Sequence, residues 1–299
     1  MTKLLFGTGQ YIYEVIQPFG NLPTNMNWGV IGRVAVDSQG NVYVSRRGDP
    51  PILIFDSHGK FLSGFGQDLL IDPHGMFFTK NDELFVADRD AHEVIKLNNK
   101  LDVILRIGTR ENAKWQAPFN HPADVAVSPS GDIYVADGYG NSSIHKFSDS
   151  GEYLLSWGVP GTGPGEFSTP HGIWVDSKSR VYVADRENSR VQIFDTDGRY
   201  ITEWIDLYHP MDIWFDDNDI AFVSDQTPRF NVLDEKGKLL SRGKAPDAGL
   251  GLYGASNGDL YLSGTFPGAA PVSNGIVKFI RQKNLHHNYP GVDLIYLNT

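Results

Sequence analysis

The sequence predicts an all-β fold, a six-bladed β-propeller of four-stranded blades that is closed by an N-terminal strand. Three observations support this prediction. A pattern of strand, polar turn and strand recurs about every 40 to 50 residues, which is the period of a propeller blade. Turn-forming residues separate the strands of each repeat. One isolated strand-like segment precedes the first repeat, where it can complete the last one. We therefore expect residues 1–299 to form a single domain.

The clearest repeat is HGIWVDSKSRVYVADRENSR, residues 171–190. An apolar strand follows His171-Gly172, a polar turn spans residues 176–179, and a second strand ends at Asp185-Arg186. Because a hairpin reverses the chain, its two ends lie at the same edge of the sheet. His171 and Arg186 are therefore expected to face one another.

The other repeats follow the same order. First strands are predicted at 34–36, 74–78, 123–127, 171–175, 211–215 and 253–256; second strands at 41–45, 83–88, 131–137, 181–184, 220–225 and 259–263; third strands at 52–55, 93–97, 143–147, 191–194, 229–233 and 276–279; and fourth strands at 61–65, 103–107, 153–157, 200–204 and 239–242. The sixth unit lacks a fourth strand, and residues 11–16 are expected to supply it. Such closure removes the open sheet edges. The tail from Gln282, which contains His286 and His287, has no place in the repeat.

Composition excludes several functional classes. The formal net charge of −10 leaves no basic patch for nucleic acid. The absence of cysteine excludes disulfides, thiolate metal sites and thiol nucleophiles. No apolar run is long enough for a membrane span, and the first residues lack a signal-peptide core. We expect a soluble, cytoplasmic protein with a small-molecule substrate and without a nucleic-acid or membrane partner. The oligomeric state is not predicted.

Propeller topology brings the starts of the first strands and the ends of the second strands to one mouth of the channel. The residues expected there are His74, His171, Met211 and Tyr253 from first strands, Arg47, Asp88, Arg89, Asp137, Asp185 and Arg186 from second strands, and Tyr139 in an adjoining loop. Imidazole, guanidinium and phenol groups around a concavity are typical of a small-molecule site.

Each of these groups also has a structural interpretation. A His-Gly pair can simply satisfy a turn, but two such pairs in alternate blades favour a shared metal site. The aspartates at the ends of the second strands are expected to lock turns, with Arg47 and Arg186 as conceivable ion-pair partners. The large apolar residues Trp174, Trp214 and Phe78 are expected to pack between blades, and His58, His92 and His145 to be surface or packing residues.

Several of these motifs together resemble peptidyl-α-hydroxyglycine α-amidating lyase, and the repeats resemble NHL-type blades. The motifs that carry the resemblance are Arg47-Gly48-Asp49, Pro73-His74-Gly75, residues 122–127 and 136–142, Pro170-His171-Gly172 and residues 184–188. The resemblance implies a six-bladed propeller that cleaves a hydroxyglycine-extended peptide to a peptide amide and glyoxylate.

The resemblance also implies roles for individual residues. His74 and His171 correspond to two of three zinc-binding histidines, Tyr139 to the catalytic tyrosine, and Arg47 and Arg186 to the active-site arginines. The third histidine is expected at the start of the sixth blade, where we place Tyr253-Gly254. The acidic residue that helps to bind structural calcium in that family is then missing as well.

Four alternatives remain for the third metal ligand. His209 and His121 each stand two residues before a first strand, Tyr253 could bind as a phenolate, and water could complete the shell; we prefer His209. Tyrosine has a pKa near 10, so it becomes a base at neutral pH only where positive charge favours the phenolate. Arg47 and Arg186 could supply that charge to Tyr139 and hold a substrate carboxylate.

We therefore predict a metal-dependent lyase of the amidating type, or a close variant that acts on a small hydroxy- or carbonyl-bearing substrate. The expected cofactor is a divalent metal, with zinc preferred over calcium. A metal-dependent hydrolase or hydratase resembling a lactonase is one alternative. A non-catalytic NHL-type propeller that binds a ligand or a protein is the other.

Overall fold

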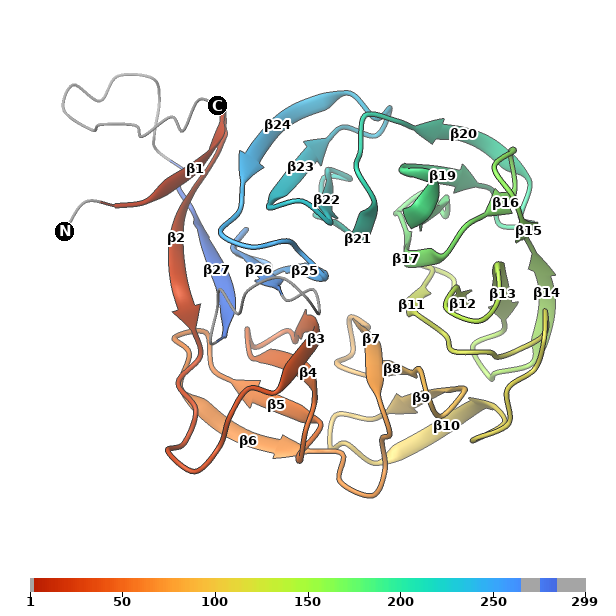
Figure 1. The fold of residues 1–299 in the computed structure, drawn as a ribbon, viewed down its shortest axis with the longest axis horizontal. Helices are drawn as coiled ribbons and strands as arrows, with labels where there is room; N and C mark the ends of the chain where they lie inside the picture. The colour runs from red at the N-terminus through yellow and green to blue at the C-terminus, as the bar shows by residue number, and fades with distance from the viewer. Residues whose placement is uncertain (1–2, 265–274, 284–299) are drawn as a thin grey trace.

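A computed structural model shows a ring of six antiparallel sheets around a central axis (Figure 1). The structure describes residues 3–264 and 275–283, so His286 and His287 of the tail lie outside the described residues. The all-β, six-bladed fold predicted from the sequence is confirmed. In the described part of the chain, no helix is long and apolar enough to cross a bilayer.

Each blade is a meander whose first strand lies nearest the axis, as Figure 1 shows. The first strands of blades one to six are β3 (Val30–Val36), β7 (Pro73–Phe78), β11 (Asp124–Val127), β17 (Pro170–Val175), β21 (Pro210–Phe215) and β25 (Gly251–Gly254). The second strands are β4 (Val42–Arg47), β8 (Leu84–Asp88), β12 (Ile133–Asp137), β18 (Val181–Asp185), β22 (Ala221–Asp225) and β26 (Leu260–Ser263). The third strands are β5 (Ile52–Phe55), β9 (Glu93–Leu97), β13 (Ser143–Phe147), β19 (Arg190–Phe194), β23 (Arg229–Leu233) and β27 (Ile276–Arg281).

The fourth strands lie on the outside of the ring. They are β6 (Phe61–Phe65), β10 (Val103–Gly108), β14 (Tyr153–Trp157), β20 (Tyr200–Trp204), β24 (Leu239–Lys244) and, for the sixth blade, β2 (Tyr11–Phe19). Between blades three and four, β15 (Val159–Pro160) pairs in parallel with β16 (Glu166–Phe167). A 3₁₀ turn, η1 (Arg186–Asn188), follows β18.

The N-terminal strand closes the ring as the sequence predicts. β2 pairs antiparallel with β27, so the first and last parts of the repeat share one sheet. A further strand that sequence reasoning missed, β1 (Leu5–Thr8), pairs with β2 and makes this blade five-stranded. Tyr13 is fully buried, and its ring packs edge-on against Phe230 of blade five and Phe279 of β27. Closure therefore joins both a sheet and an interface between blades.

Buried aspartates at the ends of second strands lock the loops that lead into the first strands, as predicted. Asp88, Asp137, Asp185 and Asp225 have 0% exposure. They accept backbone N–H groups from Ile71 and Asp72, Asn120, Ser168 and Tyr208, respectively. His145, read from the sequence as a packing or surface residue, takes part in this lock, because its Nε2 lies 3.2 Å from Asp137. The loops that carry the mouth residues are thus held by buried hydrogen bonds.

The channel shows an alternation that sequence analysis did not detect. At the same register of the innermost strands, odd-numbered blades carry a charged residue and even-numbered blades carry glycine. The charged residues are Arg33, Asp124 and Asp212, and the glycines are Gly75, Gly172 and Gly251. A Cβ atom at each glycine would lie within 3.0 Å of the Cα of Asp124, Asp212 or Arg33, respectively. The glycines therefore leave room for the charged neighbours.

These charged side chains fill the channel. The Arg33 guanidinium, in a residue with 1% exposure, forms a short ion pair with Asp212 and lies 4.0 Å from Asp124. Asp124 also accepts the Ile173 N–H at 3.0 Å, and Asp212 accepts the Leu252 N–H at 2.8 Å. The remaining void has a volume of about 10 Å³, enough for one water molecule. At the level of Arg33, Asp124 and Asp212 the channel is therefore filled by packed side chains.

The buried ring of Tyr13 allows an estimate of how much the closing strand β2 contributes to the free energy of unfolding. Replacing Tyr13 by Ala deletes a fully buried ring and is expected to lower the free energy of unfolding by roughly 3–5 kcal/mol. Ile16→Ala, on the same strand but at a side chain that is 37% exposed, is the matched control and should cost less than about 1 kcal/mol. Urea unfolding followed by tryptophan fluorescence measures both. Equal losses would show that Tyr13 packing is not what holds β2.

The channel predicts a dependence of stability on pH. Burial raises the pKa of Asp124 to about 7. Between the pKa of a free aspartate, about 3.9, and this raised value, the folded protein binds more protons than the unfolded chain, so the contribution of Asp124 to stability falls as pH rises through that window.

We expect the difference in melting temperature between pH 5 and pH 8 to be smaller in Asp124→Asn than in the wild type, because the titrating carboxyl is absent. Scanning calorimetry of both proteins, with the exposed-site variant Asp68→Asn as control, measures this. An unchanged pH profile in Asp124→Asn would contradict it.

Candidate active site

Tyr139 and the two predicted histidines meet at one mouth of the channel. The Tyr139 Oη lies 3.0 Å from His74 Nε2 and 2.9 Å from His171 Nε2. The two imidazole rings are 5.1 Å apart between centroids. His74 comes from β7, His171 from β17, and Tyr139 from the loop after β12. Ring closure thus brings together three residues that are 32 to 97 positions apart in the chain, as the topology predicted.

The neighbouring blade orients each histidine. His74 Nδ1 is 2.6 Å from the Ala123 carbonyl oxygen, and His171 Nδ1 is 2.7 Å from the Met211 carbonyl oxygen. Because a carbonyl only accepts, Nδ1 carries the hydrogen in His74; in His171 the Met211 carbonyl is likewise the nearer partner of Nδ1, with Arg33 Nη2 at 3.0 Å. Both Nε2 lone pairs then point at the Tyr139 hydroxyl, which has a single proton to donate. Two unprotonated nitrogens therefore converge on one point.

Burial keeps both imidazoles neutral. His74 is 5% exposed and His171 is 0% exposed. Burial, followed by the nearby positive charge of Arg33, holds the pKa of each ring well below its ordinary value. Neutral imidazole is the form that accepts a proton or binds a metal ion.

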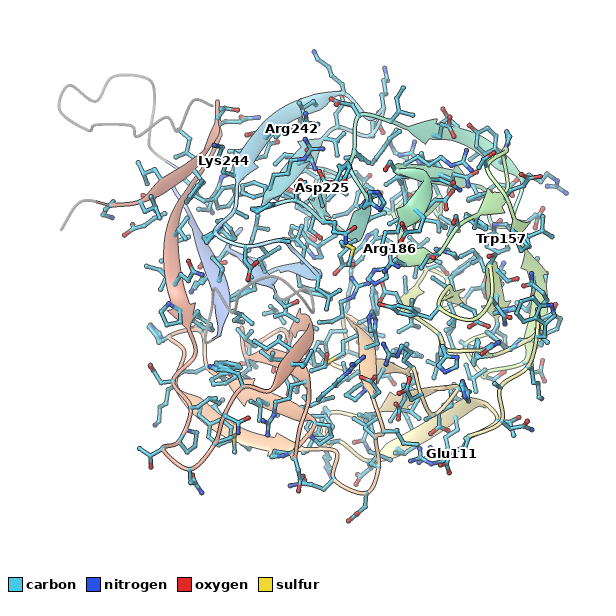
Figure 2. The ribbon with its side chains drawn as sticks, viewed as in Figure 1. Glu111, Trp157, Arg186, Asp225, Arg242 and Lys244 are labelled. Atoms are coloured by element: carbon cyan, nitrogen blue, oxygen red, sulfur yellow. The ribbon has the colours of Figure 1, made fainter. Side chains whose placement is uncertain are left out.

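Two guanidinium groups lie over the Tyr139 ring. Arg89 is 5.1 Å and Arg186 is 5.6 Å from the ring centroid. Arg186, labelled in Figure 2, is the first residue of η1 and directly follows β18. Arg89 follows β8 at the equivalent position, and sequence reasoning placed it at the mouth without assigning it a role. The signal was available, because Asp88-Arg89 repeats Asp185-Arg186.

Arg47 is more exposed to solvent than Arg89 and Arg186. Its side chain is 50% exposed and contacts Asp72 at 3.3 Å. Asp72 in turn forms a short ion pair with Arg89. Arg47 is therefore joined to the arginine above Tyr139 through one carboxylate, and none of Asp88, Asp137 and Asp185 is its ion-pair partner.

The preferred third ligand, His209, lies beside Glu187. Its Nδ1 lies 3.0 Å from Glu187 Oε2. His121 packs its ring against His92, with 4.3 Å between centroids. Within residues 3–264 and 275–283, no group of three or more histidine, aspartate or glutamate side chains could hold a metal ion. The described residues therefore supply His74 and His171 and no third such ligand.

The register predicted for Tyr253 is wrong. Gly251 pairs with Ser263 as Gly172 pairs with Ala184, so Leu250 occupies the position of His171 in the sixth blade. Leu250 N–H also bonds the Ser263 carbonyl at 2.8 Å. The segment Gly251-Leu252-Tyr253-Gly254 contains two glycines, and the second was mistaken for the equivalent of Gly172. Tyr253 instead packs against Trp174 and Trp214 in the core.

The histidine pair fits part of a metal site. A ring whose Nδ1–H is held by a carbonyl and whose Nε2 is free has the usual orientation of a metal-binding histidine. Both His74 and His171 meet this condition. A catalytic zinc site normally has three protein ligands, whereas Leu250 has no donor atom. Among the described residues, Tyr139 is the group beside both Nε2 atoms that could join them, together with substrate or water, around a divalent ion.

A cleft of about 310 Å³ opens beside Tyr139. Its walls come from the loop after β12, which includes Asn141, and from the segment around β15 and β16, which includes Thr162 and Ser168. Asn141 is buried and bonds Asp137 at 2.7 Å, so this wall is tied to the loop lock. The cleft is large enough for a small ligand.

Comparison with known proteins agrees with this architecture. A family described as "6-bladed beta-propeller" matches residues 116–203. Human NHL repeat-containing protein 3 is 36% identical over 188 residues, which cover 57% of this chain and 54% of that protein. A protein of Caenorhabditis elegans named as a probable peptidyl-α-hydroxyglycine α-amidating lyase is 36% identical over 148 residues, 48% of this chain and 42% of that protein. The chain spans about half the length of the first of these curated relatives.

Solved structures share the fold. A gluconolactonase from Xanthomonas campestris superposes with a TM-score of 0.65 at 14% identity, covering 90% of this chain and 89% of that one. Virginiamycin B lyase from Staphylococcus aureus gives a TM-score of 0.62 at 16% identity, covering 91% of this chain and 90% of that one. At these low identities the superpositions show the fold alone, and the class of protein that it defines is the six-bladed β-propeller. The chain is also similar in sequence to a protein named for its NHL repeats and to a protein named as a probable amidating lyase.

The Tyr139 loop packs closely against blade four at Gly138. A Cβ atom at Gly138 would lie 1.8 Å from the Pro170 carbonyl oxygen of blade four. Gly138→Ala is therefore expected to displace Tyr139 and cost about 1–3 kcal/mol. Gly163→Ala is the control, because its Cβ would meet only the flexible end of Glu166 at 3.2 Å. Chemical unfolding compares the two, and equal stabilities would contradict the tight fit.

Proposed function

We propose that this protein is a lyase of the peptidyl-α-hydroxyglycine type, or a close variant that acts on a small hydroxy- or carbonyl-bearing substrate. The observation that carries the proposal is the position of the Tyr139 hydroxyl, within hydrogen-bond distance of two unprotonated Nε2 atoms and beneath two guanidinium groups. Homologues named as amidating lyases support the same reaction class.

The residues suit the proton transfers of this reaction. Tyr139 takes the proton from the substrate hydroxyl, the carbon–oxygen double bond forms, and the carbon–nitrogen bond breaks. Tyr139 then passes the same proton to the leaving amide nitrogen, which gives a peptide amide and glyoxylate and restores the deprotonated tyrosine. Arg89 and Arg186 offset the negative charge of the deprotonated Tyr139 oxygen that accepts the substrate proton.

The remaining mouth residues bind and orient the substrate. Arg47, half exposed at the rim, is available to pair with a substrate carboxylate. The cleft beside Tyr139 receives the rest of the substrate. A divalent ion such as zinc, when bound by the Nε2 atoms of His74 and His171, supplies Lewis-acid polarisation of the substrate.

One observation favours a second candidate function. Leu250 stands where a third histidine would complete the ligand set, and a human relative is named only for its NHL repeats. A non-catalytic propeller that binds a ligand at this mouth is therefore the alternative. A lactonase-like hydrolase rests on shared fold alone, and lactone opening belongs in the same assay panel.

The assay is glyoxylate release from N-acyl-α-hydroxyglycine compounds by the full chain, together with metal analysis. We expect turnover, and Tyr139→Phe should lower it by roughly 10²–10⁴-fold while metal content is unchanged. Tyr153→Phe, at an exposed tyrosine on β14, is the matched control and should retain activity.

Undiminished turnover in Tyr139→Phe would remove the base assignment. Metal-free protein without glyoxylate release would favour the binding propeller. Lactone opening without glyoxylate release would favour the hydrolase. A bound metal that is lost in His74→Ala and in His171→Ala but kept in His209→Ala would support the two-histidine site.

A further inference from the structure

We propose that Arg33 is a built-in cation that occupies, in the channel, an oxygen-lined site of the kind that elsewhere holds a calcium ion. The inference concerns the scaffold and is independent of the proposed reaction. It follows from what surrounds the Arg33 guanidinium and from how the six innermost strands make room for it.

The surroundings of Arg33 are those of a hard cation. Its guanidinium contacts the Asp212 and Asp124 carboxylates. Nη2 also donates to the His171 carbonyl oxygen at 2.9 Å and to the Met211 carbonyl oxygen at 3.3 Å. Carboxylate and backbone carbonyl oxygens are the ligands that calcium takes in proteins. Here they come from three different blades and surround an organic cation.

The guanidinium does not use its full hydrogen-bonding capacity. Arg33 is 1% exposed, and its Nε has no partner among the described residues. A guanidinium chosen for its five donors would be expected to satisfy them when buried. Its positive charge, in contrast, is compensated by Asp212 and Asp124. Without Arg33 these two buried acidic side chains would have no cation between them.

The backbone is shaped around this cluster. Gly75, Gly172 and Gly251 stand where a Cβ atom would collide with Asp124, Asp212 and Arg33, respectively. The charged residues alternate with these glycines around the ring, so the cluster is built into the repeat. The one acidic residue that the family resemblance implied for structural calcium would stand at Gly251, because Leu250-Gly251 lies in the register of His171-Gly172. Arg33 supplies the positive charge instead.

Arg33 also connects the channel to the mouth. The same Nη2 that bonds the His171 carbonyl lies 3.0 Å from His171 Nδ1. Met211 O accepts from both His171 Nδ1 and Arg33 Nη2. Loss of the internal cation would therefore disturb the peptide that carries His171, as well as the stability of the ring.

The test is the response of chelator-treated, full-length protein to added CaCl₂, followed by the melting temperature and by titration calorimetry. The wild type should neither bind Ca²⁺ in the channel nor gain stability from it. Arg33→Ala opens the site and leaves both carboxylates unpaired, which should lower the melting temperature by roughly 10 °C. Calcium should then restore about half of this loss with a Kd on the order of 10⁻⁴–10⁻³ M.

Two further variants make the test specific. Arg33→Met fills the space with an uncharged side chain, so it should be destabilised without calcium rescue. Arg33→Ala combined with Asp212→Asn removes a ligand and should lose the rescue. Arg33→Lys keeps a cation and should behave as the wild type towards calcium, which provides a folded comparison should Arg33→Ala be insoluble.

Two results would overturn the proposal. One is a calcium-dependent rise in the melting temperature of the wild type that disappears in Asp212→Asn. The other is folded Arg33→Ala that ignores calcium. Because the readout is calcium-dependent stability, its failure leaves the glyoxylate assay unaffected, and an inactive protein can still pass this test.

Discussion

The pairing of β2 with β27 is the constraint on which the rest of the structure depends. Residues near the two ends of the described chain share one sheet, and Tyr13 of this sheet packs against Phe230 of blade five. Without it the innermost strands would not surround a common axis. The histidines, Tyr139 and the channel charges are neighbours only because of that axis. Their geometry is therefore a property of the whole ring and of no single blade.

Each histidine at the mouth depends on the packing of the next blade. His74 is held by a carbonyl of blade three and His171 by a carbonyl of blade five. The contact between blades thus sets the tautomer and the direction of both Nε2 lone pairs. In the same way, the Tyr139 loop depends on Gly138 fitting against Pro170. The same contacts between blades therefore stabilise the ring and orient the side chains of the site.

Much of this architecture could be read from the sequence, because strand period and turn residues report local structure. The blade boundaries, the closing strand and the convergence of His74, His171 and Tyr139 follow from periodicity and topology. The register at Leu250-Gly251 did not, because two glycines lie three residues apart and only strand pairing separates them. Arg33 escaped notice because the bulge in β3 hides its equivalence to Asp124 and Asp212. The direction of the His209 side chain, whose Nδ1 lies 3.0 Å from Glu187 Oε2, could not be read from strand spacing.

The alternation of charged residues and glycines around the channel has a consequence for how such a molecule can change. Neighbouring blades are not interchangeable at this position, since a Cβ atom at any of the three glycines would lie within 3.0 Å of the Cα atom of the charged residue on an adjacent blade. Duplication or loss of a single blade would put the inner ring out of phase, whereas gain or loss of an adjacent couple would preserve it. At this level of the channel the repeating unit is therefore a pair of adjacent blades, and the pair occurs three times around the ring.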